Sequence, residues 1–159
     1  MARLHFDSLD CKIIAMLSEN ARKPYLEIAR ECKVSGAAIH QRIQKLTLTG
    51  VINGFESLIS PAAVGFETCA YVGFILQDPM KFDHLAAELR KIPEVVECHF
   101  TTGQYDVLIK LYARNNDHLL HLLHDKIMPI GAGRTETLIS FKEEFRRQAP
   151  VIAGNIKLG

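Results

Sequence analysis

A predicted helix from Ser35 to about Leu48 carries polar side chains whose types suit contacts with DNA bases. Ile39, Ile43 and Leu46 recur at helical spacing, so we expect them to turn inward and leave the opposite face exposed. Gln and His side chains can hydrogen-bond base edges, while Gly and Ala permit close approach. A polar face that meets only water is the alternative interpretation, because most amphipathic helices have one. The candidate DNA-contacting residues are Ser35, the expected N-cap, with Gly36, Ala37, His40, Gln41, Arg42, Gln44 and Lys45.

Basic side chains around this helix can bind the phosphate backbone. Arg42 and Lys45 lie on the helix itself, and Arg22 and Lys23 lie in an earlier loop. Residues 22–45 hold six basic and two acidic side chains, a local charge of +4 in a chain whose net charge is +1. Phosphate contacts fix a protein's register on DNA without reading sequence. The charge distribution argues against a uniformly basic DNA binder but is compatible with one DNA-binding segment. On charge alone, a solvated basic face is the favoured interpretation.

A second candidate site is the loop Thr101-Thr102-Gly103-Gln104-Tyr105-Asp106 between two predicted strands. Its hydroxyls, its backbone N–H groups and the Asp106 carboxylate can together satisfy a zwitterion, and Gly103 permits close approach of a ligand. The alternative is an ordinary hairpin connection in which Asp106 caps its own loop, because Gly and Asp are common turn residues. Taken alone, the loop favours this second interpretation.

Other side-chain patterns argue against metal binding and catalysis. His118, His121 and His124 have helical spacing, but six residues turn a helix by about 600°, so the outer two diverge by about 120°. We expect all three on a face toward solvent or another subunit. Cys11, Cys32, Cys69 and Cys98 lack the short spacing of a zinc or redox site, and the sequence contains no GxSxG, Walker or GxGxxG motif. With no signal-peptide pattern at residues 1–7, we expect a non-enzymatic cytoplasmic protein without a metal or cofactor.

The periodicity of apolar residues changes near residue 50. Before it, three helices are predicted, after Asp7 or Ser8, from Pro24, and from Ser35, followed by a hairpin over 51–59 with an Asn-Gly turn. After it, strands at 69–76, 96–100, 107–111 and 135–141 alternate with helices at 82–92 and 119–127. The order βαββαβ is that of a ferredoxin-like α+β domain.

Short motifs occur in a fixed order through both halves of the chain. They are Asp7–Ile14, Asn20-Ala21-Arg22, Glu27-Ile28-Ala29, Val34-Ser35, Arg42-Ile43 with Leu46, Gly50-Val51-Ile52, Thr101–Asp106 and Thr135–Ser140. Over roughly residues 5–145 this set resembles the Lrp/AsnC (feast/famine) transcription regulators. The last two motifs are similar to the asparagine-responsive AsnC branch.

The resemblance implies a winged helix-turn-helix followed by a sandwich domain that senses amino acids. It implies domains over 1–53 (winged helix-turn-helix), 54–67 (hairpin and linker), 68–145 (effector binding and oligomerisation) and 146–159 (tail). Family members form dimers through the sandwich, commonly assemble into octamers and bind palindromic operators. By position, Ser35 to about Leu48 is the recognition helix. The implied effector residues are Thr101, Thr102, Gly103, Gln104, Tyr105 and Asp106, with Thr135, Glu136 and Thr137 closing the pocket where dimers meet.

Two positions depart from the family pattern. Many members have Gly where Lys33 stands in the helix-turn-helix turn, so Lys33 is expected to need a strained φ or a different turn. Many also have a Ser or Thr cap where Lys23 precedes Pro24.

The sequence therefore predicts a DNA-binding transcription regulator whose oligomeric state and DNA affinity respond to a small amino acid of the asparagine, leucine or methionine class. The alternatives are an amino-acid-binding module that regulates a partner enzyme, and a metal-dependent enzyme that uses the three His residues. The helix-turn-helix argues against both alternatives, because neither needs it.

Overall fold

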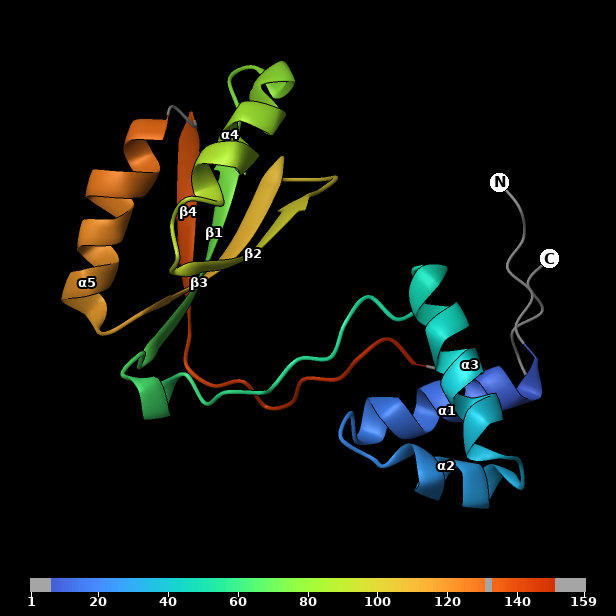
Figure 1. Ribbon diagram of the computed structural model, residues 1–159. Coiled ribbons are helices and arrows are strands. Elements are labelled where there is room, and N and C mark those ends of the chain that lie inside the picture. The colour runs from blue at the N-terminus through green and yellow to red at the C-terminus, as the bar shows by residue number, and fades with distance from the viewer. Residues whose placement is uncertain (1–6, 131–132, 151–159) are drawn as a thin grey trace. The chain divides into compact units, whose positions relative to one another are not determined.

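The computed structural model describes residues 7–130 and 133–150. These divide into two compact units, one of residues 7–58 with 145–150 and one of Ile59–Glu144, and each unit is described by itself (Figure 1). No helix in the described ranges is long and apolar enough to cross a membrane.

The first unit contains the three predicted helices, α1 (Ser8–Glu19), α2 (Tyr25–Cys32) and α3 (Gly36–Leu48). Asp7 caps α1 in a reciprocal capping box with Asp10. Ser35 caps α3, because its hydroxyl accepts a hydrogen bond from the Ala38 N–H. The predicted inward positions Ile39, Ile43 and Leu46 are confirmed, and they form one core with Ile13, Leu17, Ile28 and Ala29.

The turn between α2 and α3 confirms the expected strain at Lys33. Lys33 has a φ of 57°, in the left-handed region. The Val34 N–H donates to the Ala29 carbonyl, which closes the end of α2. Glycine usually occupies this conformation because a Cβ atom makes it costly, so the turn forms here against the local preference of Lys33.

The predicted hairpin over residues 51–59 is wrong, because the structure has no strand there. Phe55, Leu58 and Ile59 are exposed in an extended segment. An isolated two-stranded hairpin is marginal in water, and Asn53-Gly54 favours a turn without supplying a surface for the strands to pack on. The described first unit is therefore a helix-turn-helix without a hairpin wing.

The second unit is a four-stranded antiparallel sheet with helices on one face (Figure 1). Its strands, in the spatial order β2-β3-β1-β4, are β1 (Thr68–Ile75), β2 (Val95–Phe100), β3 (Val107–Ala113) and β4 (Arg134–Ser140). The covering helices are α4 (Phe82–Leu89) and α5 (Asn116–His121), and α5 continues as a π-helix over Leu122–Ile127. Short 3₁₀ turns occupy Ala62–Val64, Pro79–Lys81 and Met128–Ile130. The predicted ferredoxin-like order is confirmed.

Alternation along the central strands separates a core face from an open face. The core face contributes Ala70, Val72, Phe74, Val107, Ile109 and Leu111, which pack with Leu85, Leu89, Leu119, Leu122 and Ile127 from the helices. The open face carries Tyr71, Gly73, Leu108 and Lys110. Lys110 is nevertheless buried, and its charge is compensated by an ion pair with Glu143 at 3.0 Å. Burial opposes the charge of Lys110, but the hydrogen bond to Glu143 and its tyrosine neighbours raise its pKa above the ordinary value.

The buried side of α5 shifts where the π-helix begins. Leu120 is 64% exposed, while Leu122 is buried. Buried Leu122 and Ile127 are five residues apart, about 500° of rotation in an ordinary α-helix, which puts them on different sides. The wider π turn brings both to the sheet.

Candidate DNA-binding helix and effector loop

The outer face of α3 presents the polar side chains predicted from the sequence. Ala37, His40, Gln41, Gln44 and Lys45 are all exposed. These are side chains of the types that reach base edges and phosphates in a major groove.

The start of α3 is packed more closely than its middle. A Cβ atom on Gly36 would lie 3.2 Å from the Leu26 side chain, so Gly36 serves the contact between α2 and α3. Tyr25 of α2 meets the His40 ring edge-on, with the centroids 6.1 Å apart. Sequence reasoning missed Tyr25, because its contact with His40 depends on how the two helices cross.

Arg42 is half-buried and paired with the start of α1, unlike the exposed polar side chains of α3. Its Nη1 donates to Asp7 Oδ2 at 2.5 Å and to Asp10 Oδ1 at 2.8 Å. The Asp10 side chain is 3% exposed and that of Arg42 is 32% exposed. The backbone N–H of Asp10 and then the Arg42 guanidinium lower the pKa of Asp7, while the two carboxylates raise the pKa of Arg42. The guanidinium predicted to bind phosphate is thus neutralised by the cap of α1.

The other three predicted phosphate-binding residues also differ in whether they form ion pairs. Lys23 forms an ion pair with Glu31, and this hydrogen bond raises the pKa of Lys23. Arg22 and Lys45 are exposed, and neither is in an ion pair within the described ranges. Of the four predicted phosphate-binding side chains, Arg22 and Lys45 are therefore the two without an ion pair in the described part of the chain.

Asp106 holds the predicted effector loop to the end of β1. Its Oδ2 accepts the Leu76 N–H at 2.7 Å, and its own N–H donates to the Phe74 carbonyl at 2.8 Å. Its carbonyl accepts the Thr101 N–H at 2.9 Å. These contacts fit the interpretation in which Asp106 stabilises the turn. The N–H that its carboxylate accepts belongs to Leu76, however, directly after β1, rather than to the loop itself.

Tyr105 connects the loop to β4 across the open face of the sheet. Its hydroxyl donates to Glu136 Oε2 at 2.7 Å, and that hydrogen bond raises the pKa of Tyr105. Gln104 Nε2 lies 3.4 Å from the same oxygen, and Thr101 Oγ1 donates to the Tyr105 carbonyl at 2.6 Å. The Tyr105 ring covers Gly73, where a Cβ atom would lie 2.5 Å from ring carbons. Gly73 is a residue that sequence reasoning missed.

The remaining predicted effector residues do not converge with Glu136. Thr135 and Thr137 pair with Phe74 and Val72, so their side chains face the helix-covered side of the sheet. Thr102 and Gly103 are exposed in the loop, and Gly103 adopts a φ of 108° that favours glycine. The structure therefore brings together Gln104, Tyr105 and Glu136.

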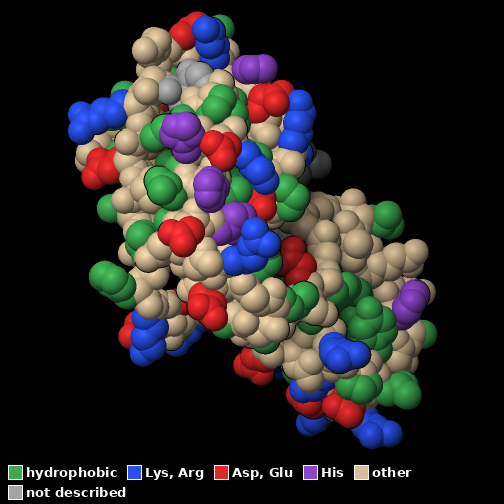
Figure 2. Space-filling view, turned by 90° about the vertical axis from the view of Figure 1, so that its left-hand side faces the viewer, with side chains coloured by type: hydrophobic (Ala, Val, Ile, Leu, Met, Phe, Trp, Pro, Cys, Tyr) green, Lys and Arg blue, Asp and Glu red, His purple; other side chains and the backbone are tan. Residues whose placement is uncertain are grey.

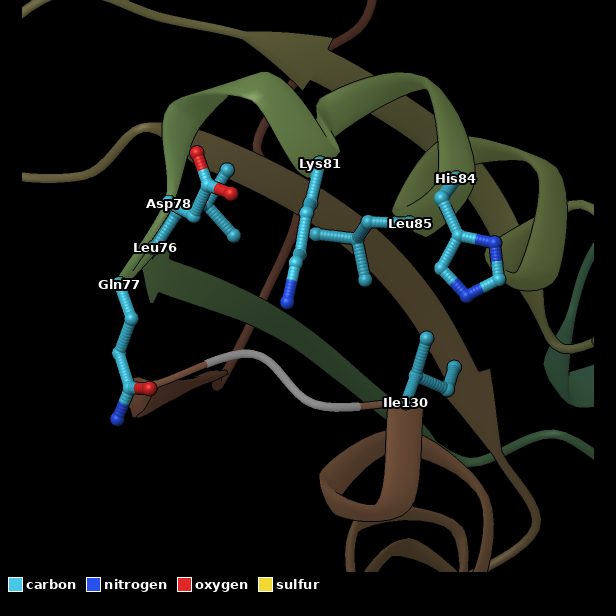
Figure 3. A pocket seen from close by; sticks show the side chains of 7 residues that line it. All are labelled: Leu76, Gln77, Asp78, Lys81, His84, Leu85 and Ile130. Atoms are coloured by element: carbon cyan, nitrogen blue, oxygen red, sulfur yellow. The ribbon is translucent and has the colours of Figure 1, made fainter.

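A small pocket lies beyond the end of β1, beside the Leu76 backbone that Asp106 holds. It has a volume of about 40 Å³, room for a few water molecules rather than for an amino acid. Lys81 projects from the start of α4 into the space bounded by Leu76, Leu85 and Ile130 (Figure 3). None of the predicted effector residues lines this pocket.

The three His residues of α5 and its π-helical continuation do not form a common site. Figure 2 shows His side chains among acidic and basic ones on the face that carries α5. His121 and His124 are exposed, as predicted, and lie beside Asp125. The prediction that His118 is exposed is wrong, because its side chain is only 15% exposed. His118 accepts a hydrogen bond from the Arg114 N–H and lies 3.6 Å from Glu94. Its pKa is lowered mainly by burial and, to a smaller extent, by the positive charge of Arg114. Within the described ranges, no group of three His, Cys, Asp or Glu side chains is arranged to hold a metal ion.

Comparisons with known proteins match both units. The model of the AsnC-type helix-turn-helix domain matches residues 6–47, and that of the Lrp/AsnC ligand binding domain matches residues 69–150. The chain is 36% identical over 142 residues to the regulatory protein AsnC of Escherichia coli (strain K12), covering 89% of this chain and 93% of that protein.

Solved structures of Lrp/AsnC proteins are also similar to this chain. The structure of E. coli AsnC superimposes with a TM-score of 0.85 at 35% identity, covering 92% of this chain and 99% of that one. A feast or famine regulatory protein from M. tuberculosis, complexed with L-methionine, superimposes with a TM-score of 0.87 at 25% identity, covering 93% and 100%. The chain described here belongs to the Lrp/AsnC family of transcription regulators, non-enzymatic proteins that join a DNA-binding helix-turn-helix to an amino-acid-binding domain.

Proposed function

We propose that α3 reads a palindromic operator through His40, Gln41 and Gln44, with Lys45 and Arg22 on flanking phosphates. The observation that carries this assignment is the contrast between these exposed side chains and the paired Arg42 and Lys23. Base contacts set sequence preference, whereas phosphate contacts set the dependence of affinity on salt. A regulator that binds operator DNA acts in the cytoplasm, which is where we place this protein.

Operator binding by full-chain variants tests the assignment. Gln41→Ala and His40→Ala should narrow the difference in affinity between operator and unrelated DNA. Lys45→Ala should weaken binding to both DNAs and make it less salt-dependent. Unchanged discrimination in both base-contact variants would refute the assignment of α3.

We propose further that a small amino acid binds at the open-face cluster of Gln104, Tyr105 and Glu136. Glu136 supports this, because its exposed carboxylate can accept hydrogen bonds from the ammonium group of an amino acid. Asparagine, leucine and methionine are the candidate classes, and L-methionine is the ligand in the M. tuberculosis relative. The loop Thr101–Asp106 shapes the site, and Thr135 and Thr137 contribute only as the strand neighbours that position Glu136, since their side chains lie on the other face.

The effector acts on DNA binding through assembly. We infer a dimer that assembles to an octamer, with the effector site completed where dimers meet. An effector changes DNA affinity only if it binds one assembly state more tightly than another, and a shared pocket supplies that difference. Several helix-turn-helix units on one particle then multiply modest individual affinities.

Thermal-shift measurements against the twenty amino acids, with light-scattering mass for each hit, test the effector proposal. A binding amino acid should raise the melting temperature increasingly with its free concentration. Glu136→Gln should remove that shift while operator binding without effector is retained. An undiminished shift in Glu136→Gln would refute the assigned site.

A further inference from the structure

Tyr25, the first residue of α2, lies against a side chain that α3 presents to solvent. Its ring meets the His40 ring with the centroids 6.1 Å apart and an interplanar angle of 65°. Aromatic pairs prefer this edge-to-face arrangement, because the positive edge of one ring meets the negative face of the other. Both side chains are exposed, and neither belongs to the core of the first unit. The contact therefore fixes the position of a surface side chain.

The neighbouring residue Leu26 holds the start of α2 against α3. A Cβ atom on Gly36 would lie 3.2 Å from the Leu26 side chain, so the absence of a side chain at Gly36 allows this close approach. Gly36 and His40 are four residues apart on α3, and residues at that spacing are neighbours on one side of a helix. Leu26 and Tyr25 thus contact α3 one turn apart, which leaves the Tyr25 ring little freedom to move away from His40.

The orientation of the His40 ring depends on this contact. In the part of the chain that the structure describes, no hydrogen bond or ion pair holds the ring nitrogens of His40. An exposed side chain without a partner changes rotamer within nanoseconds. The Tyr25 ring restricts that motion by occupying one side of the imidazole, while the other side of the imidazole stays accessible.

We propose that Tyr25 is a positioning residue for sequence recognition, which rests on the proposed reading of the operator by α3. Its ring holds the His40 imidazole in the orientation that meets a base edge in the major groove. Ordering a mobile side chain on binding costs affinity, and a side chain that is already ordered avoids this cost. His40 meets its base only at the operator, so Tyr25 should raise affinity for the operator and not for unrelated DNA.

A phosphate contact by the Tyr25 hydroxyl is the competing role, because Tyr hydroxyls also bind the DNA backbone. The two roles use different parts of the side chain. Positioning needs the ring, whereas a phosphate contact needs the hydroxyl and strengthens binding to every DNA. Tyr25→Phe separates the two roles, because it removes the hydroxyl and keeps the ring.

Affinities of full-chain variants for two duplexes of equal length test the proposal. One duplex is an operator that the wild-type chain selects from random DNA, and the other is an unrelated sequence. Tyr25→Leu removes the ring, and it should lower the ratio of operator affinity to unrelated affinity roughly two- to tenfold, the range for one aromatic pair or one immobilised side chain. Tyr25→Phe should retain the wild-type ratio. Because both affinities are measured on one preparation, an inactive fraction of a variant cancels in the ratio.

Repeating Tyr25→Leu in a His40→Ala background measures the coupling between the two side chains. If Tyr25 acts through His40, the second substitution should have no further effect on the ratio. Leu26→Ala is the matched control, because it changes the adjacent contact between α2 and α3 at Gly36 without removing an aromatic ring. Its effect on the ratio should be the same with and without His40.

Three results would overturn the proposal: an unchanged ratio in Tyr25→Leu, an equal loss in Tyr25→Phe and Tyr25→Leu, or a loss in Tyr25→Leu that persists in full without His40. The assignment of α3 is tested separately by Gln41→Ala. If Gln41→Ala lowers the ratio and His40→Ala does not, α3 remains the reading helix and only the role of Tyr25 is refuted.

Discussion

Replacing Arg42 by Met distinguishes a residue that stabilises the helix-turn-helix from one that binds DNA. The substitution removes the guanidinium and keeps an unbranched apolar chain of similar reach. It leaves Asp10, whose side chain is 3% exposed, without the cation that now neutralises it. The expected consequence is local destabilisation of the first unit, with phosphate contacts unchanged.

The size of the effect follows from how deeply the three charges are buried. Breaking a fully buried ion pair costs about 3–5 kcal/mol, whereas an exposed pair contributes about 0–1 kcal/mol. Asp10 is buried, but the side chains of Asp7 and Arg42 are 44% and 32% exposed. We therefore expect a loss of about 2 kcal/mol, roughly a thirtyfold change in the local opening equilibrium.

Native-state hydrogen exchange of the full chain measures that loss where it occurs. Amides of α1 and α3 should exchange about thirtyfold faster in Arg42→Met, while amides of the sheet should be unaffected. The slope of log affinity for operator DNA against log salt should stay the same. Lys45→Ala is the matched control, expected to change that slope by about 0.9 without changing exchange.

The opposite pattern would refute this reasoning about Arg42. If Arg42→Met reduced the salt dependence as Lys45→Ala does and left the exchange of α1 unchanged, Arg42 would be a phosphate ligand. The ion pairs with Asp7 and Asp10 would then not persist in solution.

Three further predictions concern other contacts. Lys33→Gly should stabilise the first unit by about 0.5–1 kcal/mol in the same exchange measurement, because Gly tolerates the φ of 57°, while Lys33→Ala should not. Gly73→Ala should displace the Tyr105 ring, whose carbons lie 2.5 Å from the new Cβ position, and should reduce the amino-acid-dependent thermal shift more than Tyr105→Phe does. Since the pKa of Asp7 is lowered from 3.8, its stabilising effect is complete well above pH 4 and is lost as pH falls through the lower folded value. Asp7→Asn should therefore flatten the dependence of α1 exchange on acid pH, and an unchanged acid dependence would contradict this.

Local patterns in the sequence were sufficient for most of the fold. Ile39, Ile43 and Leu46 repeat with a helical period, and Val107, Ile109 and Leu111 alternate as a strand must, so periodicity alone locates the core faces. The hairpin over 51–59 failed because a turn signal cannot supply the neighbouring surface on which two strands become stable.

The sequence does not show which site residues are already paired, because some of their partners are distant in the chain. Asp7 is 35 positions from Arg42, so the charge of Arg42 counts as DNA-binding potential until the fold is known. His118 likewise lies 3.6 Å from Glu94, a residue distant in the sequence. Strand alternation puts the side chains of Thr135 and Thr137 on the face of the sheet opposite Glu136. Residue types suggested the chemistry, but only tertiary contacts decide which groups are free to perform it.

The π-helical segment Leu122–Ile127 has a consequence for how this domain tolerates changes in length. A π turn accommodates one residue more than an α-helix needs to cover the same distance, and its side chains reach the core only because of that extra residue. Removing one residue, for example exposed His124, would let the segment close into ordinary α-helix without shortening the connection to β4 by more than a fraction of a turn. The domain can therefore absorb a single-residue deletion here, whereas a deletion inside β1 or β3 would reverse the face of every side chain that follows in the strand.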